Sequence, residues 1–285
     1  MSTSPAPVKI RLRSLPAAAG LSWIRRGFRT FWRRPLGFCG LWLFVVLCMG
    51  VAMVVSPFAV LVLLPLLPMI SLGFMLGTED VLNDLPLRVS VFWAPLTMSP
   101  AARRALLNIG LVYVVSALGL ALFAEWIDGG EATRWMEKLM TPRTDGKMPE
   151  IPPISALGEF VLLLKFFGLS LVSIPLWHAP ALVHWGRQGV AQAMFSSVVA
   201  IWRTRAAFAM FILGWITVVL GFGMLIFLLA ASLGAAAVSL AAFTCMVALT
   251  ATFYVSIWFG FVDTFEITSP VALRTAPADT DAPAP

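Results

Sequence analysis

The two histidines are the first side chains to consider as ligands or catalysts, because few residues in this sequence are able to do chemistry. His178 and His184 are six positions apart in a chain of 285 residues. Six residues of α-helix correspond to about 240° of rotation, so two imidazoles at this spacing face apart. They cannot share a metal ion on one helix. We favour the interpretation that both histidines are interfacial side chains near the end of a membrane span.

Cys48, Met49 and Met53 carry soft sulfur atoms of the kind that bind copper(I). Packing in apolar surroundings is the simpler explanation, because the chain contains 13 methionines. The sequence also has no P-loop, no nucleophile elbow, no HExxH zinc motif and no pair of carboxylates near a base. We therefore expect a protein that is not an enzyme, with no catalytic residue, no metal site and no cofactor.

Lys165 is the most informative single residue, because it lies about seven residues into an apolar stretch, where an unpaired ammonium is costly in a membrane. Glu125 and Glu159 lie at the neighbouring ends of the two predicted spans on that side. We expect an intramembrane ion pair between Lys165 and these carboxylates. Two alternatives remain open: Lys165 extends its stem to the outer interface, or it helps to move an ion or an anionic substrate.

The elements that position these residues follow from the composition. Hydrophobic residues make up 60% of the chain and charged residues 12%, against roughly 45–50% and 25% in soluble domains. Residues 35–77 and 206–262 contain no Asp, Glu, Lys or Arg. Each run is at least twice the length of about 20 residues that a membrane-spanning helix needs. The sequence therefore predicts an all-α, polytopic transmembrane helical bundle.

Proline and turn residues divide these runs into spans. Ser56-Pro57 breaks the first run, and Pro175 and Pro180 should kink or end the fourth span. Residues 231–234 form the turn-like break of the last run, which favours two spans over three cramped ones. We expect six spans within a transmembrane domain at 20–262, at about 36–55, 58–77, 105–125, 158–181, 206–230 and 235–260.

The segments outside the spans have compositions of their own. The outer segment 126–155 should contain a short amphipathic helix at 131–140, followed by a proline-rich extended strand. The tail 263–285 is rich in Ala, Pro, Asp and Thr, and we expect it to be disordered. The same prediction applies to the basic N-terminus, 1–19.

Basic residues set the predicted orientation. Eight of the 20 Lys and Arg residues precede Pro35. With six spans and both termini in the cytoplasm, 15 basic residues lie inside and four outside, as the positive-inside rule requires. The basic charge indicates contact with anionic lipid rather than with nucleic acid.

Amphipathic segments precede the predicted hairpins. Apolar residues recur at helical spacing between Leu21 and Trp32 and again from Val190 to Ile201, and a shorter version runs from Phe92 to Arg104. The pattern predicts three hairpins, each preceded by an interfacial helix. Alternatively, these segments are not a repeat: aromatic and basic residues are selected wherever a chain re-enters the bilayer. The side chains expected at anionic lipid are Trp23, Arg25, Arg26, Arg29, Trp32, Arg33, Arg34, Trp202, Arg203 and Arg205.

Small residues indicate where helices approach one another. Gly73 and Gly77 are four residues apart, and so are Ala117 and Ala121. This spacing lets helix backbones come close in a membrane, either within the chain or against a partner.

Three short motifs resemble a known family. They are Trp23-x3-Gly27-Phe28-x2-Phe31-x3-Pro35, Pro65-Leu66-Leu67-Pro68-x4-Gly73, and Ala179-Pro180-Ala181-Leu182 followed by an amphipathic stretch to Trp202. The pattern resembles uncharacterised proteobacterial inner-membrane proteins of the Burkholderia type. More remotely, it is similar to the membrane domain of some bacterial glycerophosphodiester phosphodiesterases. The resemblance implies six helices in the inner membrane and brings no established activity.

Two functions are compatible with these features. The first is a non-enzymatic accessory subunit, or an assembly or scaffold factor, that binds other membrane proteins or lipids. The alternative is a small transporter or lipid-handling protein that uses the polar region of the fourth span around Lys165.

Overall fold

The computed structural model describes residues 9–56, 63–140, 153–230 and 234–268. Within these ranges, six helical stretches are long and apolar enough to cross a membrane, so the predicted all-α polytopic fold is confirmed. The first two are α2 (Pro35–Val55) and Leu64–Leu82, which joins the 3-10 turn η1 (Leu64–Leu66) to α4 (Leu67–Leu82). The other four are α6 (Pro100–Asp128), Ala156–His184, α11 (Arg205–Ala230) and α12 (Ala235–Thr264).

Shorter elements connect these spans. The stretch Ala156–His184 consists of α8 (Ala156–Ser173), the 3-10 turn η3 (Ile174–Leu176) and α9 (Ala179–His184). The remaining elements are β1 (Lys9–Leu12), α1 (Ala19–Phe31), η2 (Val89–Phe92), α5 (Ala94–Thr97), α7 (Glu131–Met140), α10 (Val190–Arg203) and β2 (Phe265–Thr268).

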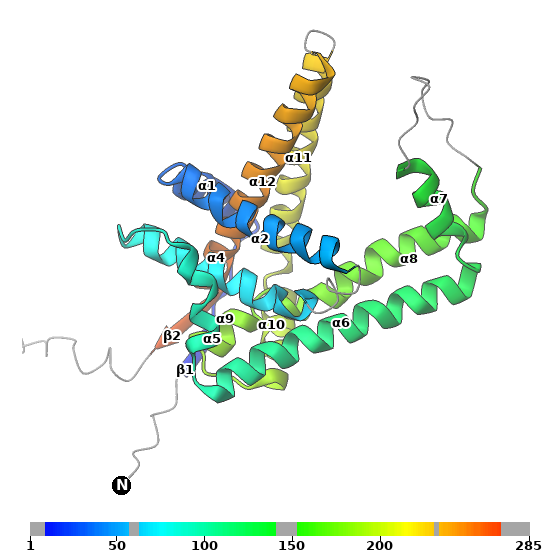
Figure 1. The fold of residues 1–285 in the computed structure, drawn as a ribbon. Coiled ribbons are helices and arrows are strands. Elements are labelled where there is room, and N and C mark those ends of the chain that lie inside the picture. The colour runs from blue at the N-terminus through cyan, green and yellow to red at the C-terminus, as the bar shows by residue number, and fades with distance from the viewer. Residues whose placement is uncertain (1–8, 57–62, 141–152, 231–233, 269–285) are drawn as a thin grey trace, which may run out of the picture.

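The spans diverge from a common base, which we define as α1, α9, α10, β1 and β2. Figure 1 shows α11 and α12 side by side as one arm, and α6 and α8 side by side as another. Contacts of α1 with α11 and α12, and of α9 and α10 with α6, join the arms to the base. The described part of the chain is therefore a set of helical hairpins held together mainly at one end.

Local sequence explains where the spans begin and end. Helix α2 ends at Val55, directly before the predicted break. Ser99 caps α6 by accepting a hydrogen bond from the Ala102 amide, so this helix begins at Pro100, five residues before the predicted start of the span. Pro175 lies in the turn η3, and the helix does not run straight through it. The last apolar run holds two long helices, as expected, and α7 has the predicted bounds.

The two ends of the chain pair with each other. Strands β1 and β2 are antiparallel, with Ile10 opposite Ile267 and Leu12 opposite Phe265. The prediction of disorder at 1–19 and 263–285 is therefore wrong for 9–12 and 263–268. Short apolar alternations there pack against the main core, which bulk composition does not reveal. The described residues exclude 1–8 and 269–285. They also exclude most of the predicted proline-rich strand.

Aromatic rings fill the core beside the base. Trp23 is 1% exposed and lies 5.3 Å from Phe208 and 5.7 Å from Phe211, measured between ring centroids. Trp177 makes edge contacts with Phe208, Phe211 and Phe253. Edge-to-face contacts of this kind are worth about 0.5–1.5 kcal/mol beyond the area that the rings bury. The aromatic core therefore stabilises the end where the hairpins meet.

Helix α1 packs between α11 and α12, so Ile24 and Phe31 of its apolar stripe are buried, whereas Leu21 and Trp32 near its ends stay exposed. A Cβ atom at Gly20 would lie 2.0 Å from the carbonyl oxygen of Ala207, and one at Gly27 would lie 2.7 Å from Ser256 Cβ. These glycines let α1 approach both helices. The prediction of an interfacial helix was wrong for this face of α1, because an apolar stripe fits a protein groove as well as a membrane surface.

We predict that Gly20→Ala destabilises the protein by about 1–3 kcal/mol, because the added methyl group meets the α11 backbone. Gly40→Ala is the matched control, since Gly40 is also helical and has no atom within 4 Å of the added Cβ. Chemical unfolding in detergent, followed by tryptophan fluorescence, measures both variants. Equal stability of the two variants would contradict the tight docking of α1.

Candidate functional site

The ion pair of Lys165 lies where α6, α7 and α8 meet. Lys165 Nζ is 2.8 Å from Glu125 Oε1 and donates a hydrogen bond to Thr133 Oγ1 at 2.7 Å. Thr133 in turn donates to Glu125 Oε1. The predicted partner Glu125 is therefore correct. A closed triangle of hydrogen bonds therefore compensates the ammonium charge.

Glu159, the other predicted partner, takes no part in this contact and is exposed in the first turn of α8. A different carboxylate joins α7 to α8: Glu131 Oε1 accepts a hydrogen bond from the Ser155 amide at 2.8 Å, and its other oxygen accepts from the Ser155 hydroxyl. The hydroxyl and the amide of Ser155 hold the pKa of Glu131 below its usual range. Glu131, which fixes the amino end of α8, was not among the predicted site residues.

Asp263 fastens α1 to the end of α12. One carboxylate oxygen accepts a hydrogen bond from Trp23 Nε1 at 2.8 Å and also pairs with the guanidinium of Arg26. That guanidinium lies 4.7 Å from the centre of the Phe259 ring. Trp23 was predicted to contact anionic lipid, and its burial shows that this prediction was wrong; Arg26, predicted for the same role, is paired with Asp263 while 35% of its side chain stays exposed. They hold the protein together because their side chains point to the packed face of α1.

The other predicted lipid-facing residues lie on the surface. Trp32 is 69% exposed and Trp202 is 70% exposed, and the Arg205 guanidinium lies 5.5 Å from the Trp202 ring centre. The remaining exposed members of this group are Arg25, Arg29, Arg33, Arg34 and Arg203. These side chains are free to contact a membrane surface.

A hollow of about 510 Å³ lies where α2 begins. Arg33, Arg34 and Asp84 line it, so two basic side chains share the hollow with one acidic side chain.

The small residues predicted to bring helices together have mixed roles. Gly73 makes room for Phe92, and Gly77 makes room for Leu87. Both partners belong to the connection between α4 and α6 rather than to another span. Ala117 is half-buried and Ala121 is exposed, so this pair forms no buried helix contact.

Gly110 is the glycine of α6 that a close backbone contact requires. A Cβ atom there would lie 1.9 Å from the carbonyl oxygen of Pro65 in η1. Gly110 was not among the predicted packing residues, although Pro65 belongs to one of the three motifs described above.

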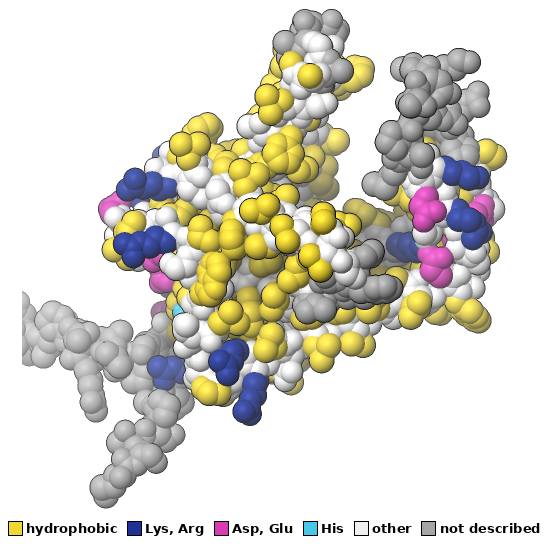
Figure 2. Space-filling view, viewed as in Figure 1, with side chains coloured by type: hydrophobic (Ala, Val, Ile, Leu, Met, Phe, Trp, Pro, Cys, Tyr) yellow, Lys and Arg dark blue, Asp and Glu magenta, His cyan; other side chains and the backbone are white. Residues whose placement is uncertain are grey.

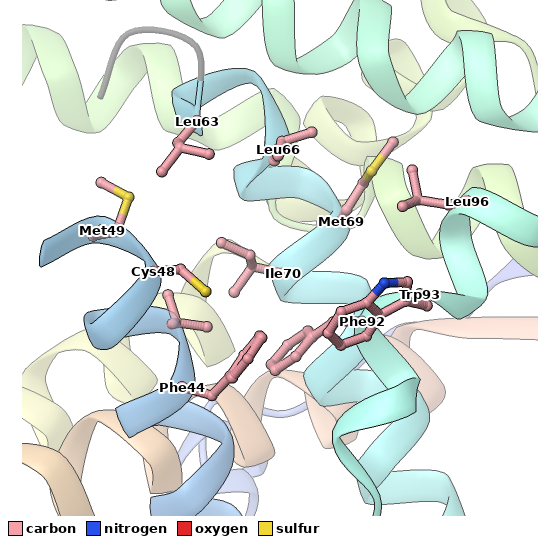
Figure 3. A pocket seen from close by; sticks show the side chains of 11 residues that line it. Phe44, Cys48, Met49, Leu63, Leu66, Met69, Ile70, Phe92, Trp93 and Leu96 are labelled. Carbon is pink, nitrogen blue, oxygen red and sulfur yellow. The ribbon is translucent and has the colours of Figure 1, made fainter. Parts of the chain in front are cut away.

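An almost wholly apolar cavity of about 270 Å³ opens between α2, α4 and the connection formed by η2 and α5 (Figure 3). Cys48 and Met49, the sulfur-bearing residues considered above, are part of this apolar lining. The full lining consists of Phe44, Val45, Cys48, Met49, Leu63, Leu66, Met69, Ile70, Phe92, Trp93 and Leu96. Its chemistry suits a hydrocarbon chain.

The two histidines have separate surroundings. His178 is fully buried, with its ring centre 5.5 Å from that of Phe208 and 5.3 Å from that of Phe265. Neither of its ring nitrogens has a hydrogen-bond partner within the described residues. His184 packs edge-on against Trp185 at 4.6 Å. Among the described residues, no three His, Cys, Asp or Glu side chains gather as a metal site would require.

The arms present apolar surfaces, whereas charge gathers at the base and around α7 (Figure 2). In α11 the buried residues end with Trp215, and no later residue of that helix is buried. Large apolar side chains continue to its end, among them Phe222, Met224 and Phe227. The outer half of the α11–α12 arm therefore has few contacts within the described chain.

The chain is similar to a probable inner membrane protein of Burkholderia thailandensis. The two sequences are 26% identical over 265 residues, which cover 92% of this chain and 97% of that relative. No protein-family model and no solved structure matches the chain. Together with the six apolar helices, the similarity identifies a multi-pass inner-membrane protein and supports the resemblance to an uncharacterised family of such proteins. None of these comparisons supports the remoter resemblance to glycerophosphodiester phosphodiesterases.

We predict that Lys165→Met lowers the free energy of unfolding by about 1–3 kcal/mol, because Glu125 loses its counter-ion. Adding Glu125→Gln should restore most of the loss, since no unpaired carboxylate is then left beside the substituted position. Lys138→Met is the control, because Lys138 is exposed on α7. Unfolding in detergent measures all three variants. Wild-type stability of Lys165→Met would exclude the structural role of this pair.

Proposed function

We propose that this chain is a non-enzymatic accessory subunit or scaffold that binds another membrane protein along the outer half of the α11–α12 arm. The unburied part of α11 after Trp215 carries this proposal. It presents large apolar side chains on a hairpin that the rest of the described chain leaves uncovered. A neighbouring transmembrane helix has the length and apolar surface to cover it.

Two glycines in the same region support a helical partner. A Cβ atom at Gly221 or Gly223 would meet no atom within 4 Å. Packing within the described chain therefore does not require either glycine, although glycine in a helix costs about 1 kcal/mol relative to alanine. Small residues in a membrane span let a second helix approach closely.

The polar groups of the spans favour this role over catalysis or transport. Lys165 is compensated by Glu125 and Thr133. The hydroxyls of Ser170 and Ser173 donate to backbone carbonyls of their own helix, at 2.9 and 2.7 Å. Transporters commonly bind substrate with polar groups and broken helices near the membrane midplane. In this chain the polar side chains named above make their hydrogen bonds within the protein itself.

Lipid handling is the second candidate, and the apolar cavity of Figure 3 favours it. Its lining of Phe44, Met49, Ile70 and other apolar side chains would hold an acyl chain. In that role the chain would bind lipid between its first hairpin and η2–α5, without need of a protein partner.

We further propose that both termini and the base face the cytoplasm, with the tips of the three hairpins outside. The distribution of 15 basic residues inside against four outside supports this orientation.

Labelling of single cysteines tests the orientation. In a variant that lacks Cys39, Cys48 and Cys245, we expect Gly234→Cys at the tip of the α11–α12 arm to react with a membrane-impermeant maleimide in whole cells. Arg33→Cys at the base should react only after the membrane is opened. The reverse pattern would overturn the orientation.

Photo-crosslinking tests the partner. A photoreactive amino acid in place of Phe227, which is 73% exposed, should give one discrete crosslinked protein in cells at native expression. The same amino acid in place of Phe166, 69% exposed on the other arm, is the matched control and should not give that product. Gly221→Leu should abolish the product while leaving the thermal stability unchanged, because a Cβ atom added here has no atom of the described residues within 4 Å.

Identical products at both positions, or no product at either, would contradict a partner site on α11. Lipid as the sole crosslinked species at Phe227 would contradict the accessory role and favour lipid handling. Mass spectrometry of the crosslinked material distinguishes these outcomes.

A further inference from the structure

A second polar hollow lies at the base, where the start of α6 meets the end of α9. Its volume is about 580 Å³, within the range of roughly 300–1,000 Å³ of small-molecule sites. Its polar lining comprises Ser99, His184, Arg187 and Gln188, and no carboxylate is among its described lining residues. Met98, Ala105 and Val183 add an apolar side. This combination of cationic and apolar walls is absent from the cavity of Figure 3.

The loop that carries Arg187 is held firmly in place. Trp185 packs against Trp258 and Phe261, with ring centres 5.0 and 5.5 Å apart. The amide of Gln188 donates to the carbonyl oxygen of Leu182 at 3.2 Å. The guanidinium of Arg187 is therefore presented from a fixed loop rather than from a free chain end.

Arg187 adopts a backbone conformation that residues other than glycine rarely adopt. Its φ is 51°, in the left-handed region, where a non-glycine residue has a conformational cost. Glycine would fit this position with less strain. The cationic side chain thus occupies a position that the backbone alone would assign to glycine.

Two polar atoms beside Arg187 lack partners. Gln188 Oε1 and His184 Nδ1 are buried and have no hydrogen-bond partner within the described residues. Buried polar atoms are usually paired, so atoms of this kind call for a ligand or a bound water. Gln188 Oε1 accepts hydrogen bonds only, and it would suit a donor on the same ligand.

The geometry points to a binding site for a phosphate-bearing headgroup of a membrane lipid. Arg187 would bind the phosphate oxygens by charge-assisted hydrogen bonds, and the amino end of α6 adds a favourable dipole. Gln188 lines the hollow, and its side-chain oxygen, which is buried without a partner within the described residues, would turn into the hollow to accept a hydrogen bond from the ammonium of phosphatidylethanolamine or a hydroxyl of phosphatidylglycerol. The apolar wall would contact the first part of the acyl chains. The site is remote in sequence from the α11 surface proposed for a protein partner, and either proposal can fail alone.

Native mass spectrometry of the full, delipidated protein tests the site with three added lipids: phosphatidylethanolamine, phosphatidylglycerol and diacylglycerol. We expect the two phospholipids to bind and the phosphate-free diacylglycerol not to. Arg187→Gly removes the guanidinium and relieves the backbone strain, so it should raise the apparent Kd about tenfold or more without loss of thermal stability. The apparent Kd of Arg187→Lys should lie between those of the wild type and Arg187→Gly. Arg88→Ala, which changes an exposed arginine outside the hollow and outside the residues expected at anionic lipid, should bind as the wild type does.

Unchanged lipid binding by Arg187→Gly would overturn the site, and so would equal binding of diacylglycerol. A loss of the same size in Arg88→Ala would mean that lipid binding depends on general surface charge, and it would also overturn the site. Inorganic phosphate, added in the absence of lipid, distinguishes the source. Arg187-dependent thermal stabilisation by inorganic phosphate, without Arg187-dependent lipid binding, would assign the hollow to a soluble anion and overturn the lipid proposal.

Discussion

The carboxylate of Asp263 makes the contact on which the arrangement of the chain depends. Through Trp23 and Arg26 it joins the end of α12 to a helix 237–240 residues earlier in the sequence. Helix α1 leads through a short turn into α2, so the same contact ties the first hairpin to the last. The pairing of β1 with β2 closes the chain at the same end. One partly buried carboxylate thus connects α1 to the end of α12. The Asp263 carboxylate, the Trp23 indole N–H and the Arg26 guanidinium satisfy one another, whereas each of them buried without a partner would destabilise the fold.

Close packing of the helices at the base depends on glycines, which have no side chain to keep two backbones apart. In lipid there is little hydrophobic gain when helices associate, so van der Waals contact and hydrogen bonds must hold them together. Gly20 brings α1 to the backbone of α11, and Gly110 brings α6 to Pro65. Trp215 adds a hydrogen bond from its Nε1 to Ser256 Oγ at 3.3 Å, between α11 and α12. Among the described residues, no such contact joins the outer half of the α11–α12 arm to that of the α6–α8 arm, which explains why these two hairpins diverge there.

Apolar runs of fixed length predicted the six helices well, because a bilayer of about 30 Å admits few other structures. The partner of Lys165 was also predictable, since a charge at this depth needs a counter-charge and Glu125 was at hand. The roles of Trp23 and Arg26 could not be predicted from the sequence. A helix with one apolar stripe and flanking arginines has the same pattern whether the stripe meets lipid or protein. Only the three-dimensional position of Asp263 decides between these cases.

The separation of a tied base from open arms limits what kind of recognition is possible at each end. On the outer half of α11 no charged side chain is present, so selectivity there must come from shape, through the glycines at 221 and 223 and the large side chains around them. At the base the opposite holds, because arginines line two hollows and the aromatic core fixes their loops. Shape acts over contact distances, whereas charge acts over about a Debye length. The base is therefore the end that can attract a ligand from a distance, and the arms are the end that can discriminate one apolar surface from another.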